Sequence, residues 1–376
     1  MKMLGFLRDM KMLKMLRCKS ILLAGFLFFC AAAGGADQAK SNKWLVSPET
    51  VVDRMEILWQ NKLPMDNSDS LERLFILNNY VYVLSANNYM VCLNSQTGSV
   101  IFSRYIAAQG IPVMGLALYS NKLVSIVGNN LVEIAPESGV EQNSEHLDFN
   151  AVCPAARNDA YFYVAGTDKC IRALRAKDKI PVFTFSAEND SAITSVIADG
   201  NSVIFATDKG NVISVRPDSH KQQWRFSAGG AVVGPIVEDA DDLFFACRDT
   251  NIYKISALTG RFVWKCQMEA ILDEAPVVTK EFVYQYVRDR GLAAIDKKSG
   301  RIIWQAAGGD KLLTEANEKA YVITNTGTLV VMDNKKAKQL YSVELAGISR
   351  YATNLTDSKI YVADGTGRIT CLKPLK

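Results

Sequence analysis

Short apolar runs recur along residues 54–376, separated by Gly, Asp, Asn and Ser. One stretch shows the pattern clearly, with four successive runs at 275–279, 281–287, 291–296 and 301–305. Short runs bounded by turn-forming residues predict antiparallel strands. The run at 291–296 is apolar on both alternating faces, so this strand needs cover on both sides. Each unit is therefore predicted to be a four-stranded sheet with two faces to bury.

The four-run unit repeats with a period near 40 residues. The last apolar position of each third run falls at Leu93, Ile134, Leu174, Val215, Ile255, Ile295, Met332 and Leu372. The successive spacings are 41, 40, 41, 40, 40, 37 and 40 residues. A fixed period of this length indicates a repeat architecture. Sheets packed face to face in a closed ring, a β-propeller, would bury both faces of every unit.

An aromatic residue usually stands in the fourth run, where we expect it to pack against the neighbouring blade. These positions are Trp59, Phe102, Phe183, Trp224, Trp264, Trp304 and Tyr341. Blade two has Asn143 in this place, and the turn of blade seven lacks its glycine. Because an aromatic side chain buries about 150–250 Å², we predict a structural role for these residues rather than a role in stacking on a ligand.

The two ends of the repeat region complement each other. The eighth unit stops after three runs, whereas residues 54–60 form a run with no partner before it. Placing 54–60 in the last sheet removes a free edge. The prediction is an all-β fold: an eight-bladed β-propeller of four-stranded antiparallel blades, with the ring closed by the N-terminal strand. Residues 1–36 are predicted to be a signal peptide, 37–53 a linker and 54–376 the propeller.

Charge is concentrated at the N-terminus. The chain has 43 basic and 39 acidic residues, of which six and one fall within residues 1–36, which leaves 37 and 38 in the remainder. The predicted propeller is therefore nearly neutral and lacks the basic surface that nucleic-acid binding needs. We do not expect a nucleic-acid partner.

The N-terminal segment has the order of a secretory signal. Basic residues precede an apolar core at 21–33, which is too short to cross a bilayer. Small residues follow, and the bond between Ala36 and Asp37 suits cleavage. The protein is predicted to be exported to a periplasm or cell envelope. Because the basic part is long, the true start stays open among the methionines Met10, Met12 and Met15.

A lipid-modified Cys30 is the alternative to a cleaved soluble form, although Phe29 precedes it where a small residue is usual. Membrane contact is thus expected only through a partner or through that lipid. Six cysteines lie beyond the signal, and none forms a CxxC motif. Cys92 and Cys371 hold the same place in the first and last units, so a disulfide between them stays open.

Residues suited to catalysis or metal binding are sparse. The only histidines are His146 and His220, which leaves little for a histidine metal cluster or a Ser-His-Asp triad. The glycine-rich stretch 229–234 lacks the lysine of a phosphate loop. The acidic stretch 238–242 lacks the spacing of a calcium loop. No catalytic, cofactor-binding or metal-binding residue is predicted, and no cofactor is expected.

The motif "GLAAIDKKSGRIIW" at 291–304, with its weaker copies in the other blades, resembles the repeat of pyrroloquinoline-quinone (PQQ)-like propellers. With the signal and the N-terminal closure, the chain is similar to the BamB family, scaffolds of the outer-membrane β-barrel assembly machinery. The resemblance implies a non-enzymatic protein, expected as a monomer, that docks on a protein partner. Asp273 and Glu274 before Pro276 match in part an acidic corner that the family uses for docking. The family's companion Leu/Arg loop is not matched by "SAGGAVVGP" at 227–235.

Two other functions remain open at this point. Quinone-dependent dehydrogenases resemble the same repeat, but they are much longer and often carry two adjacent cysteines, which this chain lacks. An exported ligand-binding or sensing propeller would share the fold and differ only in its loops.

Overall fold

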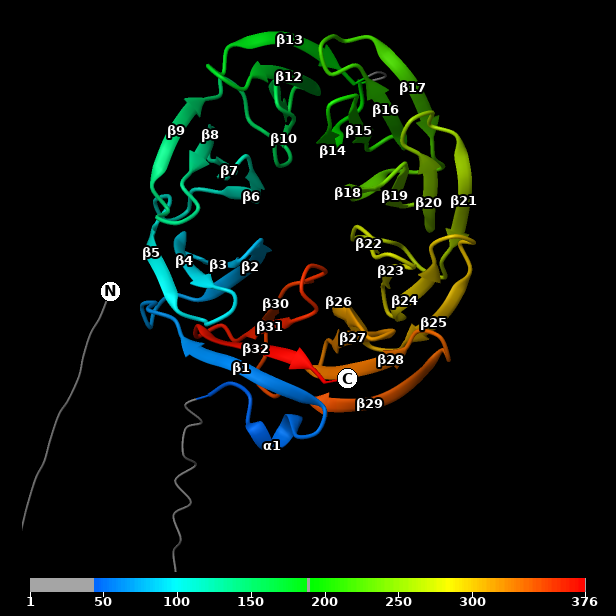
Figure 1. Ribbon diagram of the computed structural model, residues 1–376. Helices are drawn as coiled ribbons and strands as arrows, with labels where there is room; N and C mark the ends of the chain where they lie inside the picture. The colour runs from blue at the N-terminus through cyan, green and yellow to red at the C-terminus, as the bar shows by residue number, and fades with distance from the viewer. Residues whose placement is uncertain (1–43, 188–189, 376) are drawn as a thin grey trace, which may run out of the picture. The chain divides into compact units, whose positions relative to one another are not determined.

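The computed structural model describes residues 44–187 and 190–375, and these form one compact unit. In the described part, the strands form eight four-stranded antiparallel sheets arranged in a ring (Figure 1). The first strand of each sheet lies toward the centre and the fourth lies outside (Figure 1). The predicted fold is confirmed. The predicted signal peptide and Cys30 lie outside the described residues.

Each of the first four blades contains four consecutive strands. Blades one and two contain β2 (Leu71–Leu77), β3 (Tyr80–Ser85), β4 (Tyr89–Asn94), β5 (Val100–Tyr105), β6 (Val113–Tyr119), β7 (Lys122–Val127), β8 (Asn130–Ile134) and β9 (Glu141–His146). Blades three and four contain β10 (Ala156–Arg157), β11 (Tyr161–Ala165), β12 (Cys170–Arg175), β13 (Pro181–Ser186), β14 (Ile193–Ala198), β15 (Val203–Thr207), β16 (Asn211–Val215) and β17 (Gln222–Ser227).

The same order continues until the last blade. Blades five and six contain β18 (Val232–Asp239), β19 (Asp242–Cys247), β20 (Asn251–Ser256), β21 (Phe262–Gln267), β22 (Val277–Val278), β23 (Phe282–Val287), β24 (Gly291–Asp296) and β25 (Ile302–Ala306). Blade seven contains β26 (Gly309–Ala316), β27 (Lys319–Thr324), β28 (Thr328–Asp333) and β29 (Lys338–Glu344). Blade eight contains β30 (Arg350–Tyr351), β31 (Ile360–Ala363), β32 (Arg368–Pro374) and β1 (Met55–Lys62).

The N-terminal strand closes the ring, as the sequence predicted. β1 pairs antiparallel with β32, from Met55 opposite Pro374 to Lys62 opposite Arg368, and the two strands lie side by side in Figure 1. Just before β1 lies the short helix α1 (Pro48–Val51). The backbone of Val46 both donates to and accepts from the Gln60 amide, at 3.0 and 2.8 Å. This clamp ties the segment before α1 to the closing strand.

The hydrophobic core is divided among the interfaces between neighbouring blades. Each of the eight clusters of buried apolar residues draws its members from two adjacent sheets. Leu292 to Ile295 of β24 are at most 3% exposed, because blades five and seven cover its two faces. The stability of each sheet therefore depends on its neighbours.

A repeated contact joins consecutive blades through the tryptophans. The indole N–H of Trp264 in blade five donates to the carbonyl oxygen of Lys297 in blade six, at 3.1 Å. The ring lies against Gly300, where an added Cβ would come within 2.7 Å of the indole. Gly300 also has a φ of +72°, which favours glycine. Trp59 and Trp224 make the same donation to the backbone carbonyls of Ser95 and Ala257 in the equivalent turns. Trp304 donates instead to the side-chain amide oxygen of Asn334 in its equivalent turn, at 3.0 Å.

The aromatic positions differ in burial. Trp59, Trp224, Trp264 and Trp304 are buried, at 5–9% exposure, whereas Phe102, Phe183 and Tyr341 are only partly buried. In the two blades that have a phenylalanine at this position, the ring has no N–H to donate. A tyrosine in the second strand of the same blade donates a hydrogen bond to the next blade instead. The hydroxyl of Tyr82 donates to the carbonyl of Pro136 at 2.9 Å, and that of Tyr163 donates to the carbonyl of Pro217 at 2.6 Å.

At the interface between blades two and three, a cluster of buried charged residues supplements the apolar core. Lys179, in the turn position that Gly300 holds in blade six, has a buried ammonium group that donates to the Ala176 carbonyl at 2.7 Å. The same ammonium pairs with buried Glu133 of β8 at 3.1 Å. Arg157 pairs with Glu133 at 3.1 Å, and its guanidinium lies 4.5 Å from the ring centroids of Tyr119 and Phe162. The ion cluster therefore occupies the place that a tryptophan takes elsewhere.

Replacing Lys179 with Met should destabilise the protein by about 1–3 kcal/mol, because it removes a hydrogen-bonding partner from a buried carboxylate and a buried carbonyl. Arg157 and Lys122 still face Glu133, at 3.1 and 3.4 Å, which limits the loss. Urea unfolding at pH 7 measures the change. Exposed Lys177 in the same turn supplies the control, since Lys177→Met should leave the midpoint unchanged. Equal midpoints for both variants would contradict a stabilising role for Lys179.

The same cluster predicts a pH dependence. Burial tends to raise the pKa of Glu133, but the hydrogen bonds and charges of Lys179 and Lys122 outweigh it, and the net effect lowers this pKa. A lowered folded-state pKa adds stability above the unfolded value and loses it as the pH falls through the folded value. Unfolding curves between pH 3 and 7 should therefore show a smaller pH dependence for Lys179→Met than for the wild type.

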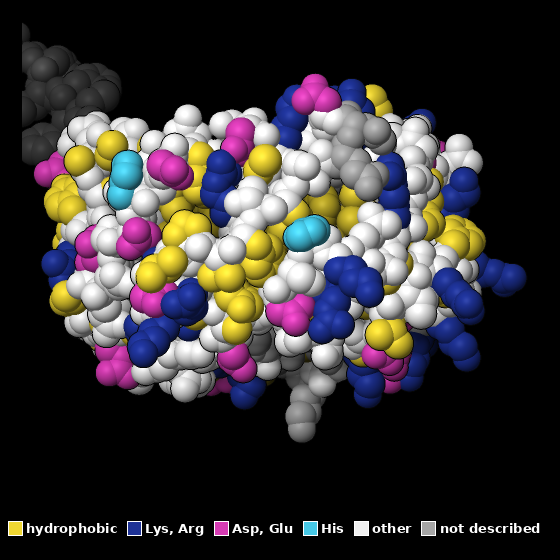
Figure 2. All heavy atoms as spheres, turned by 90° about the horizontal axis from the view of Figure 1, so that it is seen from above, with side chains coloured by type: hydrophobic (Ala, Val, Ile, Leu, Met, Phe, Trp, Pro, Cys, Tyr) yellow, Lys and Arg dark blue, Asp and Glu magenta, His cyan; other side chains and the backbone are white. Residues whose placement is uncertain are grey.

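The outer rim carries mixed side chains. Figure 2, which views the ring from the side of β13, shows hydrophobic side chains interspersed with Lys, Arg, Asp and Glu. Val140, Ile180 and Val182, near the starts of β9 and β13, are among the exposed apolar residues. Charged side chains on outer strands hinder edge-to-edge pairing between molecules.

Candidate functional site

The predicted docking residues lie on the loop that joins β21 to β22, at residues 268–276. Asp273 is half-buried and Glu274 is exposed. Leu272 is fully buried in the interface of blades five and six, while Ile271 beside it is 47% exposed. Buried Leu272 therefore anchors the loop, and the loop presents the Asp273 and Glu274 carboxylates and the Ile271 side chain at the surface.

Two ion pairs hold this loop to the turn between β23 and β24. Asp273 pairs with Arg288, and Glu269 pairs with Arg290 at 3.2 Å. Buried Gln285 in β23 donates from its side-chain amide to the backbone carbonyl of Glu274 at 3.0 Å. The backbone of the loop at Glu274 is therefore held from β23, and the Glu274 side chain stands exposed on it. We call residues 269–274 with Arg288 and Arg290 the acidic corner.

Blade seven adds further negative charge beside the acidic corner. The Tyr351 hydroxyl donates to Asp310. Burial, this hydrogen bond and the negative charges of Asp310 and Glu274 raise the pKa of Tyr351. Glu274 and Asp310, from consecutive blades, therefore act on the same tyrosine. The sequence pattern did not single out Ile271 and Arg288 within the acidic corner, or Asp310 beside it.

The loop at 228–231, which lacks the family's Leu and Arg, packs under the turn between β19 and β20. Gly229 donates its N–H to Asp249 at 3.2 Å, and the backbone N–H of Arg248 donates to Ala231 at 2.8 Å. Arg248 is exposed. A basic side chain thus stands beside this loop, although it comes from the neighbouring turn.

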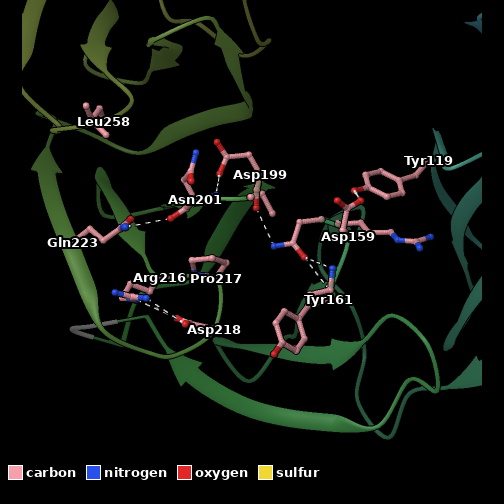
Figure 3. A pocket seen from close by; sticks show the side chains of 15 residues that line it. Tyr119, Asp159, Tyr161, Asp199, Asn201, Arg216, Pro217, Asp218, Gln223 and Leu258 are labelled. Atoms are coloured by element: carbon pink, nitrogen blue, oxygen red, sulfur yellow. Dashed lines mark hydrogen bonds and ion pairs between the residues drawn. The ribbon is translucent and has the colours of Figure 1, made fainter.

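A cleft of about 1020 Å³ lies on the other edge of the blades, among the turns of blades two to five. Antiparallel order places the turns between first and second strands and between third and fourth strands at one edge, and all other connections, including the acidic corner, at the other. Figure 3 shows Asp159 and Tyr119 on one side of the cleft and Asp199 and Asn201 on another, with Tyr161 below. The volume is at the upper end of the range of about 300–1,000 Å³ for ligand pockets.

In the described part of the chain, no group of three or more His, Cys, Asp or Glu side chains could hold a metal ion. His146 is exposed and its ring nitrogen lies 3.3 Å from the Asn130 amide oxygen. Within the same residues, no helix has the length and apolarity needed to span a membrane.

Cys92 and Cys371 are both free thiols, so the disulfide that the sequence left open does not form. Because they hold the same place in successive blades, their side chains enter different interfaces. Cys92 packs between blades one and two, and Cys371 packs between blades eight and one. Burial raises the pKa of each thiol to about 12.

Comparison with known proteins agrees with this architecture. The family model described as "Outer membrane protein assembly factor BamB" matches residues 52–226 and 208–356. The chain belongs to this family. The crystal structure of BamB from Moraxella catarrhalis is similar over 85% of this chain and 97% of that BamB chain, with a TM-score of 0.65 and 12% identity.

Two solved structures that are not named BamB are about as similar to this chain as the Moraxella catarrhalis BamB structure is. The computationally designed Ika8 protein has a TM-score of 0.65 at 13% identity and covers 82% of this chain and 98% of its own. The C-terminal WD40 domain of Sif2 has a TM-score of 0.62 at 13% identity, and the match covers 86% of this chain and 99% of the Sif2 domain. No curated protein sequence matches the chain significantly. The structural likeness therefore shows the fold, and the BamB family assignment depends on the family model.

Proposed function

We propose that this protein is a non-enzymatic, exported scaffold that binds a protein partner in the assembly of outer-membrane proteins. The BamB family match supports the general role. The observation that carries the docking site is the acidic corner, in which exposed Glu274 and Ile271 stand on a loop held by two ion pairs and Gln285. A fixed loop loses little conformational entropy when it binds.

The acidic corner suits a partner with a basic and partly apolar surface. Glu274 and Asp310 supply negative charge, and Ile271 supplies apolar area that is already exposed. Charge complementarity of this kind favours fast association and the correct orientation. We propose Asp273 as the residue that positions the loop through Arg288, and Glu274 as the residue that contacts the partner.

In the BamB family that the chain resembles, the docking partner is the subunit of the assembly machinery that inserts barrels into the outer membrane. Replacing Glu274 with Lys should lower affinity for the soluble periplasmic part of that subunit by about tenfold, because an attractive pair becomes a repulsive one. Surface plasmon resonance with the purified partner measures the change. Glu281→Lys, an exposed charge reversal at the opposite edge of the same blade, is the matched control and should bind as the wild type does. Unchanged affinity in both variants would contradict docking at the acidic corner.

The enzymatic alternative makes a separate prediction. A quinone-dependent dehydrogenase would purify with quinone absorbance and would oxidise alcohols in a dye-linked assay. We expect neither.

The mass of the mature protein tests export, because cleavage after Ala36 and lipid attachment at Cys30 leave different N-termini.

A ligand-binding role is the second candidate, and the cleft among blades two to five favours it. Its volume and its position away from the acidic corner would let the protein hold a ligand and a docking partner at once.

A further inference from the structure

The cleft is walled by turns from consecutive blades. Asn158, before β11, donates from its amide to the backbone carbonyl of Asp199, before β15, at 2.9 Å. This hydrogen bond joins the turns of blades three and four. The cleft is therefore a built feature of the interface, with a defined wall on each side.

The charged groups around the cleft differ in whether they have an ionic partner. Its two arginines are already paired within the chain, Arg157 with Glu133 at 3.1 Å and Arg216 with Asp218 at 3.1 Å. Asp159 and Asp199 have no cationic partner among the described residues. Within 44–187 and 190–375, the Asp159 carboxylate accepts one hydrogen bond, from the Tyr119 hydroxyl at 3.0 Å.

Asp199 acts mainly as a cap for its own turn, since it accepts from the backbone N–H groups of Asn201 and Ser202, each at 2.7 Å. The pKa of Glu238 in blade five is raised, mainly by burial and secondly by the negative charge of Asp199. The charge of Asp199 therefore also acts on the next blade. The Asp199 carboxylate is thus left without a cation from the described part of the chain, whereas Lys122, Arg157 and Lys179 gather around Glu133 at the interface of blades two and three.

The repeat provides an internal template for what such a carboxylate binds. Asp239, 40 residues after Asp199, holds the equivalent turn position in blade five. Asp239 pairs with the ammonium group of Lys297 from blade six, and that ammonium also donates to the Thr279 carbonyl at 3.0 Å. A lysine side chain therefore reaches over this turn from the neighbouring blade.

In blade five the residue equivalent to Lys297 is Ala257. The two backbones are alike, since the carbonyl of each accepts a tryptophan N–H, at 2.9 Å for Ala257 and 3.1 Å for Lys297. The alanine carries no charge to offer Asp199. The cation that completes the turn in blade five has no counterpart in blade four.

Apolar surface lies beside this carboxylate. Leu258, next to Ala257, lines the cleft and is 78% exposed. Pro217 and the ring of Tyr161 line it as well. A ligand that fits the cleft therefore combines a cationic group with an apolar flank.

We propose that the cleft binds a segment of a partner polypeptide that carries a lysine or arginine next to an apolar residue. The basic side chain would pair with Asp199 in the way that Lys297 pairs with Asp239, and the apolar neighbour would pack on Leu258. A polypeptide is favoured over a small amine because the cleft extends across turns of four blades. The site lies on the opposite edge from the acidic corner, so the proposal is independent of docking there.

Fluorescence anisotropy on the full chain tests this proposal with a labelled acetyl-Leu-Lys-Leu-Lys-Leu-amide peptide. The matched neutral probe replaces each lysine with glutamine. We expect the lysine peptide to bind, with affinity that falls as salt rises, and the glutamine peptide to bind at least about tenfold more weakly. Absence of binding by the lysine peptide, or equal binding of both peptides, would overturn the proposal.

Two variants locate the site. Asp199→Asn keeps an oxygen to cap the turn but removes the charge, and should weaken the lysine peptide by about tenfold. Ala257→Lys places an ammonium where Lys297 stands in the next blade, and should block binding from within the chain. Asp241→Asn, an exposed turn acid on the same edge, is the control and should bind as the wild type does. Wild-type affinity in both Asp199→Asn and Ala257→Lys would overturn the proposal, and thermal melting checks that each variant is folded.

A third probe separates the two sources of a cation. N-acetyl-lysine amide has the same ammonium group without the flanking leucines. We expect it to compete with the peptide only at concentrations at least about tenfold higher, because it cannot pack on Leu258. Equal potency of the amide would show a small-amine site and would overturn the polypeptide assignment.

Discussion

Removing residues 37–61 is expected to lower the melting temperature by about 10 °C or more, or to abolish cooperative unfolding. The truncation deletes most of β1, which pairs with β32 along its whole length. Buried Trp59 is lost as well, and truncation of a buried tryptophan alone costs about 3–5 kcal/mol. Leu372 and Cys371 in β32, both fully buried, would lose their neighbouring strand.

Two further chains show whether strand pairing is the cause. Removal of residues 37–43 alone keeps β1 and should leave the melting curve unchanged. In a second chain, residues 52–62 are moved to follow Lys376. Because the N–H of Leu375 already donates to the carbonyl of Arg54 at 3.1 Å, a short hairpin can join the two strands, and stability should return. A melting curve that is unaffected by loss of 37–61 would contradict closure by the N-terminal strand.

Trp264→Ala is expected to destabilise the protein by about 3–5 kcal/mol. The indole is 7% exposed, lies against Gly300 and is tilted against Phe244 with ring centroids 6.0 Å apart. Its loss leaves a cavity between blades five and six, and it also leaves the Lys297 carbonyl without its N–H donor. Chemical unfolding followed by circular dichroism measures the change.

Three related variants separate the contributions. Trp264→Phe keeps an aromatic ring but removes the N–H, and should cost about 1–3 kcal/mol. Gly300→Ala should destabilise the same interface, because its Cβ would meet the indole at 2.7 Å and its φ is +72°. Phe262→Ala changes a 53% exposed aromatic on the same strand and should stay within about 0.5 kcal/mol of the wild type. Similar effects of Trp264→Ala and Phe262→Ala would show that the tryptophan has no special structural role.

Much of the fold could be predicted from the sequence because its signals are local. The runs at 291–296 and 281–287 agree with β24 and β23 to within a residue. Their boundaries depend on turn residues next to them, as at Gly300. The bounds of the first strand of a blade were harder to predict. In blade six the apolar run covers 275–279, but β22 is only two residues long.

The candidate sites were predicted only in part. Asp273 and Glu274 were singled out by their place before Pro276. Gln285 in β23 and Arg288 in the turn after it hold this loop, and neither has a signature of its own in the sequence. The cleft had no sequence signal, because its walls come from turns about 40 residues apart that meet only when the blades stand side by side.

The sequence by itself determined the number of blades, the closing strand and the tryptophan positions, because a repeat of about 40 residues with alternating apolar positions carries that information within each unit. The tertiary structure decided how individual charges and thiols are paired. Glu133 pairs with Lys179, 46 residues away, and Asp239 pairs with Lys297, whereas the repeat equivalent of Lys297 in the preceding blade is the uncharged Ala257. Cys92 and Cys371 enter different interfaces, on the two sides of blade one. These outcomes depend on which side chain of one blade faces which turn of the next, and that geometry exists only in the closed ring.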